Sequence, residues 1–133
     1  MNPDVKELFD ALADAEQEID YETSTELFRN IFEGYDTNAF FNLSERDVKR
    51  VKNTLNTHAL KWLEKTNKQL NLKHDIEGKE LSLMLSTFKV IHSNRDIDNS
   101  ITHKIKAMLT LARNKHFILD YVLQSMDSKK LDA

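Results

Sequence analysis

The sequence predicts an all-α protein: a compact bundle of about five helices, with a long third helix and a long, apolar C-terminal helix. Three observations lead to this fold class. Glycine occurs only twice and proline once in 133 residues, whereas sheet-rich proteins need turn glycines. β-branched residues do not form the runs that are typical of strands. Apolar residues instead recur at steps of three and four, the spacing that aligns side chains on one face of a helix.

The length and composition of the chain favour a single domain. A hydrophobic fraction of 40% over 133 residues is enough for a core without disulfides or a metal. We expect residues 1–127 to form one helical domain and residues 128–133 to form a short, disordered tail. Cysteine is absent, which excludes a disulfide scaffold, a thiolate zinc site and a cysteine nucleophile. The acidic N-terminus has no signal-peptide pattern and no run of about 18 apolar residues occurs, so we expect a cytoplasmic protein without a membrane span.

The first two helices are expected near the N-terminus. One covers residues 3–19, because Asn2 is a good capping residue and the proline after it suits the first helical position. The other is expected to be capped by Thr23 or Ser24 and to end at Gly34. Each has an apolar stripe that predicts its buried face. The stripes are Val5, Leu8, Phe9, Leu12, Ala15 and Ile19 in the first helix, and Leu27, Phe28, Ile31 and Phe32 in the second.

Residues 45–71 predict the long third helix. Ser44 is followed three residues later by an acid, a pattern close to the capping box. The expected buried face is Val48, Val51, Leu55, Ala59, Trp62, Leu63 and Leu70. The preceding stretch, 35–43, is short, and we expect it to form a single helical turn that buries both Phe40 and Phe41.

Two further helices are expected at residues 77–92 and 100–126. The fourth buries Leu81, Met84, Leu85, Phe88 and Ile91. The fifth is capped by Asp98, Asn99 or Ser100, and its first half is one-sided, through Ile101, Ile105, Met108 and Ala112. Its second half is apolar on nearly every side and includes Phe117, Ile118, Tyr121 and Val122. This half is either the centre of the bundle or a contact surface. A homodimer is the commonest way to cover such a surface.

The charges are unevenly distributed along the chain. Residues 1–45 carry twelve acidic and two basic side chains, whereas residues 46–74 carry eight basic and two acidic ones. The acids of the first helix are expected to form a face that attracts a basic partner, or to pair loosely with the basic helix of the same molecule. The members of this face that we expect to contact a protein are Glu7, Asp10, Asp14 and Glu18.

The third helix carries a stripe of basic residues opposite its apolar face. Arg and Lys side chains on such a stripe can contact nucleic acid phosphates, or can simply solvate an exposed helix. The residues concerned are Arg46, Lys49, Arg50, Lys61, Lys65 and Lys68. The chain as a whole is acidic, with a net charge of −3, and no aromatic residue clearly shares the stripe. The sequence therefore favours solvation over nucleic acid binding.

The stretch "HSNRDIDNSITH", residues 92–103, is the best candidate for a metal or catalytic loop. His92, Asp96, Asp98 and His103 are residue types that bind zinc or iron. However, common sites place two ligands at i, i+3 or i+4 on one regular element, and no such His/acid pair stands out here. Asn, Asp and Ser are the residues that end one helix and cap the next. We therefore interpret the stretch as a turn. His116 fits the apolar stripe of the last helix better than a catalytic role.

The functional prediction is a small non-catalytic protein-binding module, such as a regulator, adaptor, immunity-type or inhibitor protein. Its contacts are expected at the acidic face of the first helix and in the apolar C-terminal helix. The alternative is a nucleic-acid-associated protein that uses the basic stripe of the third helix. No phosphate-binding glycine loop or nucleophile motif occurs, so we expect no enzymatic activity and no cofactor.

Overall fold

The computed structural model describes residues 2–72, 76 and 78–112. Within these residues it contains five α-helices and one 3-10 turn, and no strand. The elements are α1 (Pro3–Gln17), α2 (Tyr21–Gly34), η1 (Thr37–Ala39), α3 (Glu45–Leu72), α4 (Gly78–Ser93) and α5 (Asn99–Ala112). The predicted all-α bundle with a long third helix is confirmed. The predicted continuation of the last helix to residue 126 lies outside the described residues and has no support from the structure.

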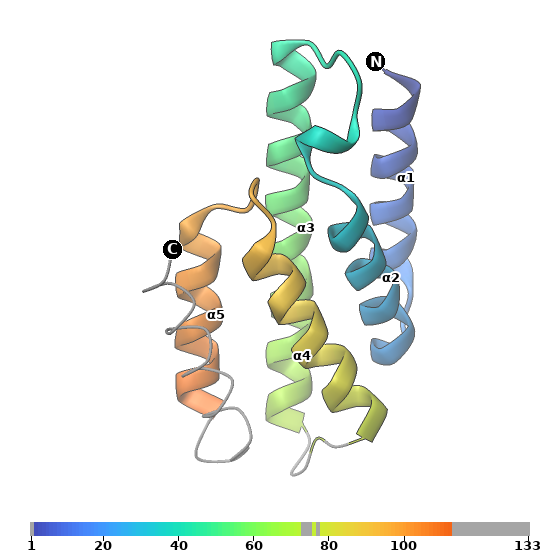
Figure 1. The fold of residues 1–133 in the computed structure, drawn as a ribbon. Coiled ribbons are helices and arrows are strands. Elements are labelled where there is room, and N and C mark those ends of the chain that lie inside the picture. The colour runs from blue at the N-terminus through green and yellow to red at the C-terminus, as the bar shows by residue number, and fades with distance from the viewer. Residues whose placement is uncertain (1, 73–75, 77, 113–133) are drawn as a thin grey trace.

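The long helix α3 stands at the centre of the arrangement (Figure 1). Helices α1 and α2 form an antiparallel hairpin that packs on α3, and α2 also makes extensive contact with α4. Helix α5 lies against the other side of α3. The α1–α2 turn and the last turn of α3 meet at one end of the bundle, whereas η1 and the first turn of α3 lie at the opposite end (Figure 1).

The core confirms most of the predicted apolar stripes. The predicted face of α3 is buried from Val51 to Leu70, and only Val48, in the first turn, is half-buried. The largest fully buried side chain is Trp62, whose ring meets that of Phe88 edge-on with centroids 5.1 Å apart. These contacts join α3 to α4 across the centre of the bundle.

The buried polar groups of α2 and α3 satisfy one another. The indole N–H of Trp62 donates to Thr25 Oγ1 at 3.0 Å. The Tyr21 hydroxyl shares a hydrogen bond of 2.8 Å with Thr66 Oγ1. Burial raises the pKa of Tyr21 to about 12, because the phenolate would lose its hydration. Tyr21 therefore acts as a neutral structural link between the two helices.

The helix starts follow the expected capping chemistry, except in α2. The Asn2 side chain accepts the Asp4 N–H at 2.8 Å, and Ser44 Oγ accepts the Asp47 N–H at 3.1 Å, as predicted. The prediction of a Thr23 or Ser24 cap for α2 is wrong, because Asp20 caps this helix by accepting the Thr23 N–H. The helix therefore begins at Tyr21, because the Asp20 carboxylate satisfies the orphan Thr23 N–H of the first turn.

Three predicted core residues are exposed: Ile19, Phe41 and Leu27, of which Leu27, at 40%, is the least exposed. Ile19 is 97% exposed because α1 ends at Gln17 and residue 18 is already extended, so Ile19 lies beyond the apolar stripe. Phe41 is 86% exposed, whereas Phe40 is half-buried beside Tyr35. The backbone at residue 40 is extended, and neighbouring side chains of an extended chain point to opposite sides, so only one of the two rings reaches the core.

Candidate protein-binding surface

The outer face of α1 carries an exposed group of carboxylates, which we call the acidic face: Glu7, Asp10 and Asp14. The buried positions Val5, Leu8, Leu12 and Ala15 fix which side of the helix faces the bundle. The acids therefore point outward by helical periodicity. None of the three forms an ion pair within the described residues.

Glu18 does not belong to this face, which corrects the prediction. It follows the end of α1 and is half-buried, and its backbone carbonyl accepts a hydrogen bond from Lys65 Nζ at 3.2 Å. Its carboxylate lines clefts at the end of the bundle instead. The helical spacing that placed it on the stripe holds only while the helix continues.

Glu16 lies on the flank of α1 that faces α3. One carboxylate oxygen lies 2.9 Å from Lys61 Nζ and the other lies 3.3 Å from His58 Nδ1. Burial lowers the pKa of His58, the Glu16 carboxylate raises it in part, and Lys61 lowers it further. The predicted pairing of the acidic and basic helices within one molecule therefore occurs at Glu16, and not on the acidic face.

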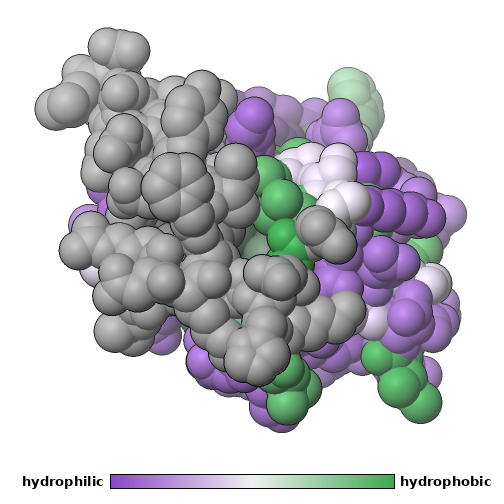
Figure 2. Space-filling view, turned by 90° about the horizontal axis from the view of Figure 1, so that it is seen from below, coloured by the Kyte–Doolittle hydropathy of each residue, from purple (hydrophilic) through white to green (hydrophobic). Residues whose placement is uncertain are grey.

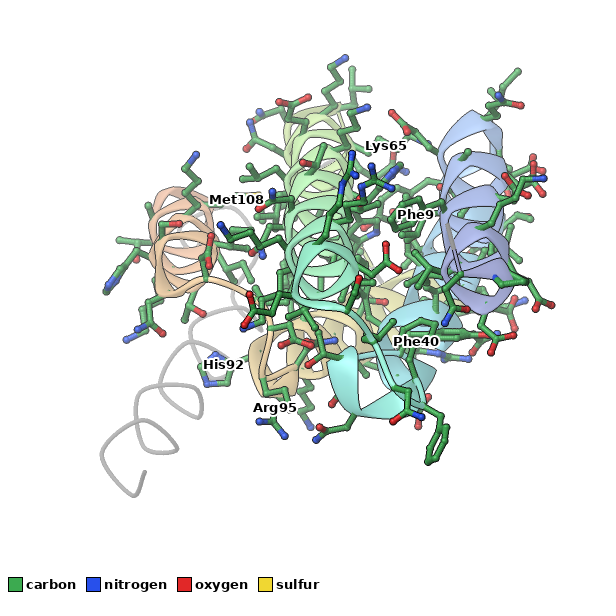
Figure 3. The ribbon with its side chains drawn as sticks, turned by 90° about the horizontal axis from the view of Figure 1, so that it is seen from above. Phe9, Phe40, Lys65, His92, Arg95 and Met108 are labelled. Atoms are coloured by element: carbon green, nitrogen blue, oxygen red, sulfur yellow. The ribbon has the colours of Figure 1, made fainter. Side chains whose placement is uncertain are left out.

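Three of the six residues of the predicted basic stripe make contacts inside the chain. Lys61 pairs with Glu16, and Arg50 lies 4.0 Å from Asp47. Lys65 points from α3 toward α1 (Figure 3), where its Nζ donates to the Glu16 carbonyl at 2.7 Å, to the Glu18 carbonyl and to Ser24 Oγ. Lys65 thus serves as a cap for the C-terminal carbonyls of α1. Burial lowers the pKa of its ammonium group, and the carboxylates of Glu16 and Glu18 raise it in part.

The other three, Arg46, Lys49 and Lys68, are exposed and form no ion pair within the described residues. Arg46 and Lys68 are separated along α3 by roughly 33 Å, from a rise of about 1.5 Å per residue. Their charges are therefore spread over the length of the helix.

The end of the bundle holds apolar side chains that the sequence reasoning placed elsewhere or overlooked. Leu72, the last residue of α3, is 79% exposed, and it lines the same cleft as the exposed Ile19. Between α1 and α2, a further shallow groove is lined by Ala11, Leu27 and Tyr35, and Leu27 is 40% exposed despite its predicted burial. The end of a helix is the hardest feature to place from sequence, which explains why the exposure of Ile19 and Leu72 was missed. Leu27 lies inside α2, and the groove beside it depends on how α1 and α2 pack.

The stretch from residue 92 to residue 103 forms a turn that ties four elements together. Asn94 Nδ2 donates to the carbonyls of Phe32 and Tyr35 at the end of α2. The buried carboxylate of Asp96 accepts the Thr37 N–H at 2.6 Å and the Thr37 hydroxyl at 3.2 Å. Asn56 on α3 bridges the Asp96 carbonyl and the Asp98 N–H. The acids and amides of this stretch thus satisfy backbone groups.

The two histidines of the candidate metal loop lie on different helices and differ in exposure. His92 is half-buried at the end of α4 (Figure 3), and His103 is exposed on α5. In the part of the chain that the structure describes, no group of three or more His, Cys, Asp or Glu side chains could hold a metal ion. Within the same residues, no helix is both long and apolar enough to cross a membrane.

The remaining predicted contact residues fall outside the described part of the chain. They are Phe117, Ile118, Tyr121 and Val122, together with His116. No protein family matches the chain, and no curated protein or solved structure is significantly similar to it. The function is therefore inferred from the geometry of the described surface.

Proposed function

We propose that this protein is a non-catalytic protein-binding module that engages a basic segment of another protein through the α1–α2 hairpin. The observation that supports this most directly is the acidic face. Its three carboxylates are exposed and unpaired within the described residues, although Glu16 on the same helix pairs with Lys61. Exposed charge of one sign contributes little to stability, but it steers an oppositely charged partner and rejects others.

Binding of this kind suits a regulator, adaptor, immunity-type or inhibitor protein, because each of these acts through a surface. The apolar residues of the predicted C-terminal helix remain a proposed second contact. A homodimer is the proposed arrangement if that helix presents an apolar face.

A selection experiment tests the proposal. The chain is immobilised and exposed to displayed random peptides at about 0.15 M salt. We compare it with the triple variant Glu7→Lys, Asp10→Lys and Asp14→Lys, and with a control, Arg46→Glu, Lys49→Glu and Lys68→Glu. We expect both the parent and the control to enrich peptides rich in Lys and Arg, and the acidic-face variant to lose this enrichment. Equal enrichment by all three proteins, or none by the parent, would contradict the proposal.

Nucleic acid binding through α3 is the second candidate, and the exposed, unpaired state of Arg46, Lys49 and Lys68 is what favours it. It requires affinity for a DNA or RNA strand that falls steeply as salt rises. The same triple Glu variant provides the test, since it should abolish such binding. Binding that persists in this variant would remove α3 from consideration.

A further inference from the structure

Two adjoining clefts lie at the end of the bundle where the α1–α2 turn meets the last turn of α3. The first, which we call the end groove, has a volume of about 370 Å³ and is lined by Ile19, Leu72 and Lys68, among others. The second, which we call the acidic cleft, is lined by Glu18, Asp20, Glu22 and Glu80. Ile19, Glu18, Tyr21 and Gln69 border both, so the two form one continuous surface.

The apolar part of this surface is unusual for its exposure. Ile19 is 97% exposed and Leu72 is 79% exposed, and the two come from different elements yet border the same groove. A single exposed aliphatic side chain is common on any protein, but two that share a concave site give a partner an anchor. Figure 2 views this end of the molecule, and among the residues that are drawn in colour, hydrophobic groups stand out from largely hydrophilic ones.

The surface is held in place by the contacts beneath it. Lys65 fixes the end of α1 through the Glu16 and Glu18 carbonyls, and Asp20 caps α2. Gln69 donates to the buried carboxylate of Glu80 at 3.1 Å, which joins α3 to α4. A surface that is already ordered loses little conformational entropy when a partner binds.

The charges indicate which partner fits. Glu18 and Glu22 form no ion pair within the described residues, and Asp20 and Glu80 add negative charge to the same cleft. These carboxylates attract Lys or Arg and repel the phosphates of a nucleic acid. Lys68 lines the end groove and not the acidic cleft, so its positive charge disfavours a second cation in the end groove. The charges therefore favour a partner segment that places its basic side chain in the acidic cleft.

We infer that this end of the bundle is the docking point of the partner, and that the docked segment is amphipathic, with an aliphatic side chain next to Lys or Arg. The inference rests on the proposed function and specifies where and what the module binds. The aliphatic side chain packs between Ile19 and Leu72, while the cation enters the acidic cleft. The acidic face of α1 then acts at longer range, by steering the same basic segment toward this site.

The test uses an amphipathic helical peptide of leucine and lysine of about 15 residues, the shortest length at which such a helix is stable. The ¹⁵N-labelled full chain is titrated with the peptide, and amide chemical shifts are recorded at about 0.15 M salt. We expect the largest changes around Ile19, Glu22 and Leu72. A scrambled peptide of the same composition, which lacks an apolar face, is expected to bind at least about tenfold more weakly.

Three variants separate the contributions. Ile19→Ser with Leu72→Ser should weaken binding at least about tenfold, because both side chains lose buried apolar area. Glu18→Gln with Glu22→Gln should weaken binding and reduce its dependence on salt. Phe41→Ser is the matched control, since Phe41 is equally exposed but precedes α3 at the opposite end (Figure 1), and it should bind as the parent does.

Three results would overturn the inference in different ways. Shifts confined to the acidic face, with no effect of the Ile19 and Leu72 substitutions, would exclude this docking point and leave the proposed function standing. An absence of any binding by basic peptides would contradict the proposed function as well. A self-associated chain whose shifts at Ile19 and Leu72 depend on its own concentration would identify a second copy as the occupant and overturn the assignment of a basic partner.

Discussion

Lys65 offers the sharpest test of how the charges of α3 are used. Its ammonium group donates to two backbone carbonyls at the end of α1 and to Ser24 Oγ. Replacement with Met keeps most of the aliphatic stem but removes all three donors. Hydrogen bonds to a charged group contribute about 1.5–3 kcal/mol, and Lys65 is only half-buried, so we expect a value near or below the lower end of this range, about 1–2 kcal/mol. The lowered pKa shows that desolvation of the cation offsets part of the gain.

The assay is chemical unfolding followed through the fluorescence of Trp62, the single tryptophan, which is fully buried. Lys68→Met is the matched control, because this lysine is exposed on the same helix, one turn further on. We expect Lys65→Met to lower the free energy of unfolding by about 1–2 kcal/mol and the control to change it by less than about 0.5 kcal/mol. Equal stability of the two variants would refute the role of Lys65 as a cap for α1.

Three further predictions concern the interior and its pH dependence. His58→Gln should reduce the loss of stability as the pH falls from about 7 toward 5. The pKa of His58 in the folded chain lies below the ordinary value of 6.5, so the unfolded chain binds the proton more readily. Urea titrations that show an unchanged dependence of the free energy of unfolding on pH would contradict this. Thr25→Val should cost about 1–3 kcal/mol, because the Trp62 N–H loses its acceptor, and equal unfolding midpoints would exclude that role. Asp96→Ala should cost a similar amount, about 1–3 kcal/mol, and expose the Thr37 amide to faster hydrogen exchange, whereas unchanged exchange would show that the contact is dispensable.

The sequence was sufficient to predict the helices because their apolar stripes are regular. From Val51 to Leu70, every predicted core position of α3 is buried, and the cap at Asn2 is the one expected. Local chemistry of this kind depends on residues three or four positions apart, so it is legible in the chain itself. The end of α1 could not be predicted from the sequence. Gln17 and Ile19 differ little in helix preference, and the cap at Asp20 competes with continuation of the helix.

The candidate surface was only partly predictable, because some of its contacts depend on how the helices pack. The acidic face follows from the periodicity of α1 and lies where it was expected. The engagement of Lys65 with the α1 carbonyls depends on how two helices pack, which sequence spacing does not encode. The shared groove of Ile19 and Leu72 likewise joins residues more than fifty positions apart. Tertiary contacts thus changed the interpretation of Lys65, whose helix was predicted correctly.

The most direct measurement of the central claim compares two labelled ligands under one condition. Fluorescence anisotropy is recorded for the leucine–lysine peptide and for a single-stranded oligonucleotide, each titrated with the chain at about 0.15 M salt. We expect the peptide to bind and the oligonucleotide not to bind. The three substitutions Glu7→Lys, Asp10→Lys and Asp14→Lys together should weaken binding of the peptide. Binding of the oligonucleotide without binding of the peptide would contradict the claim that the acidic hairpin is the functional surface.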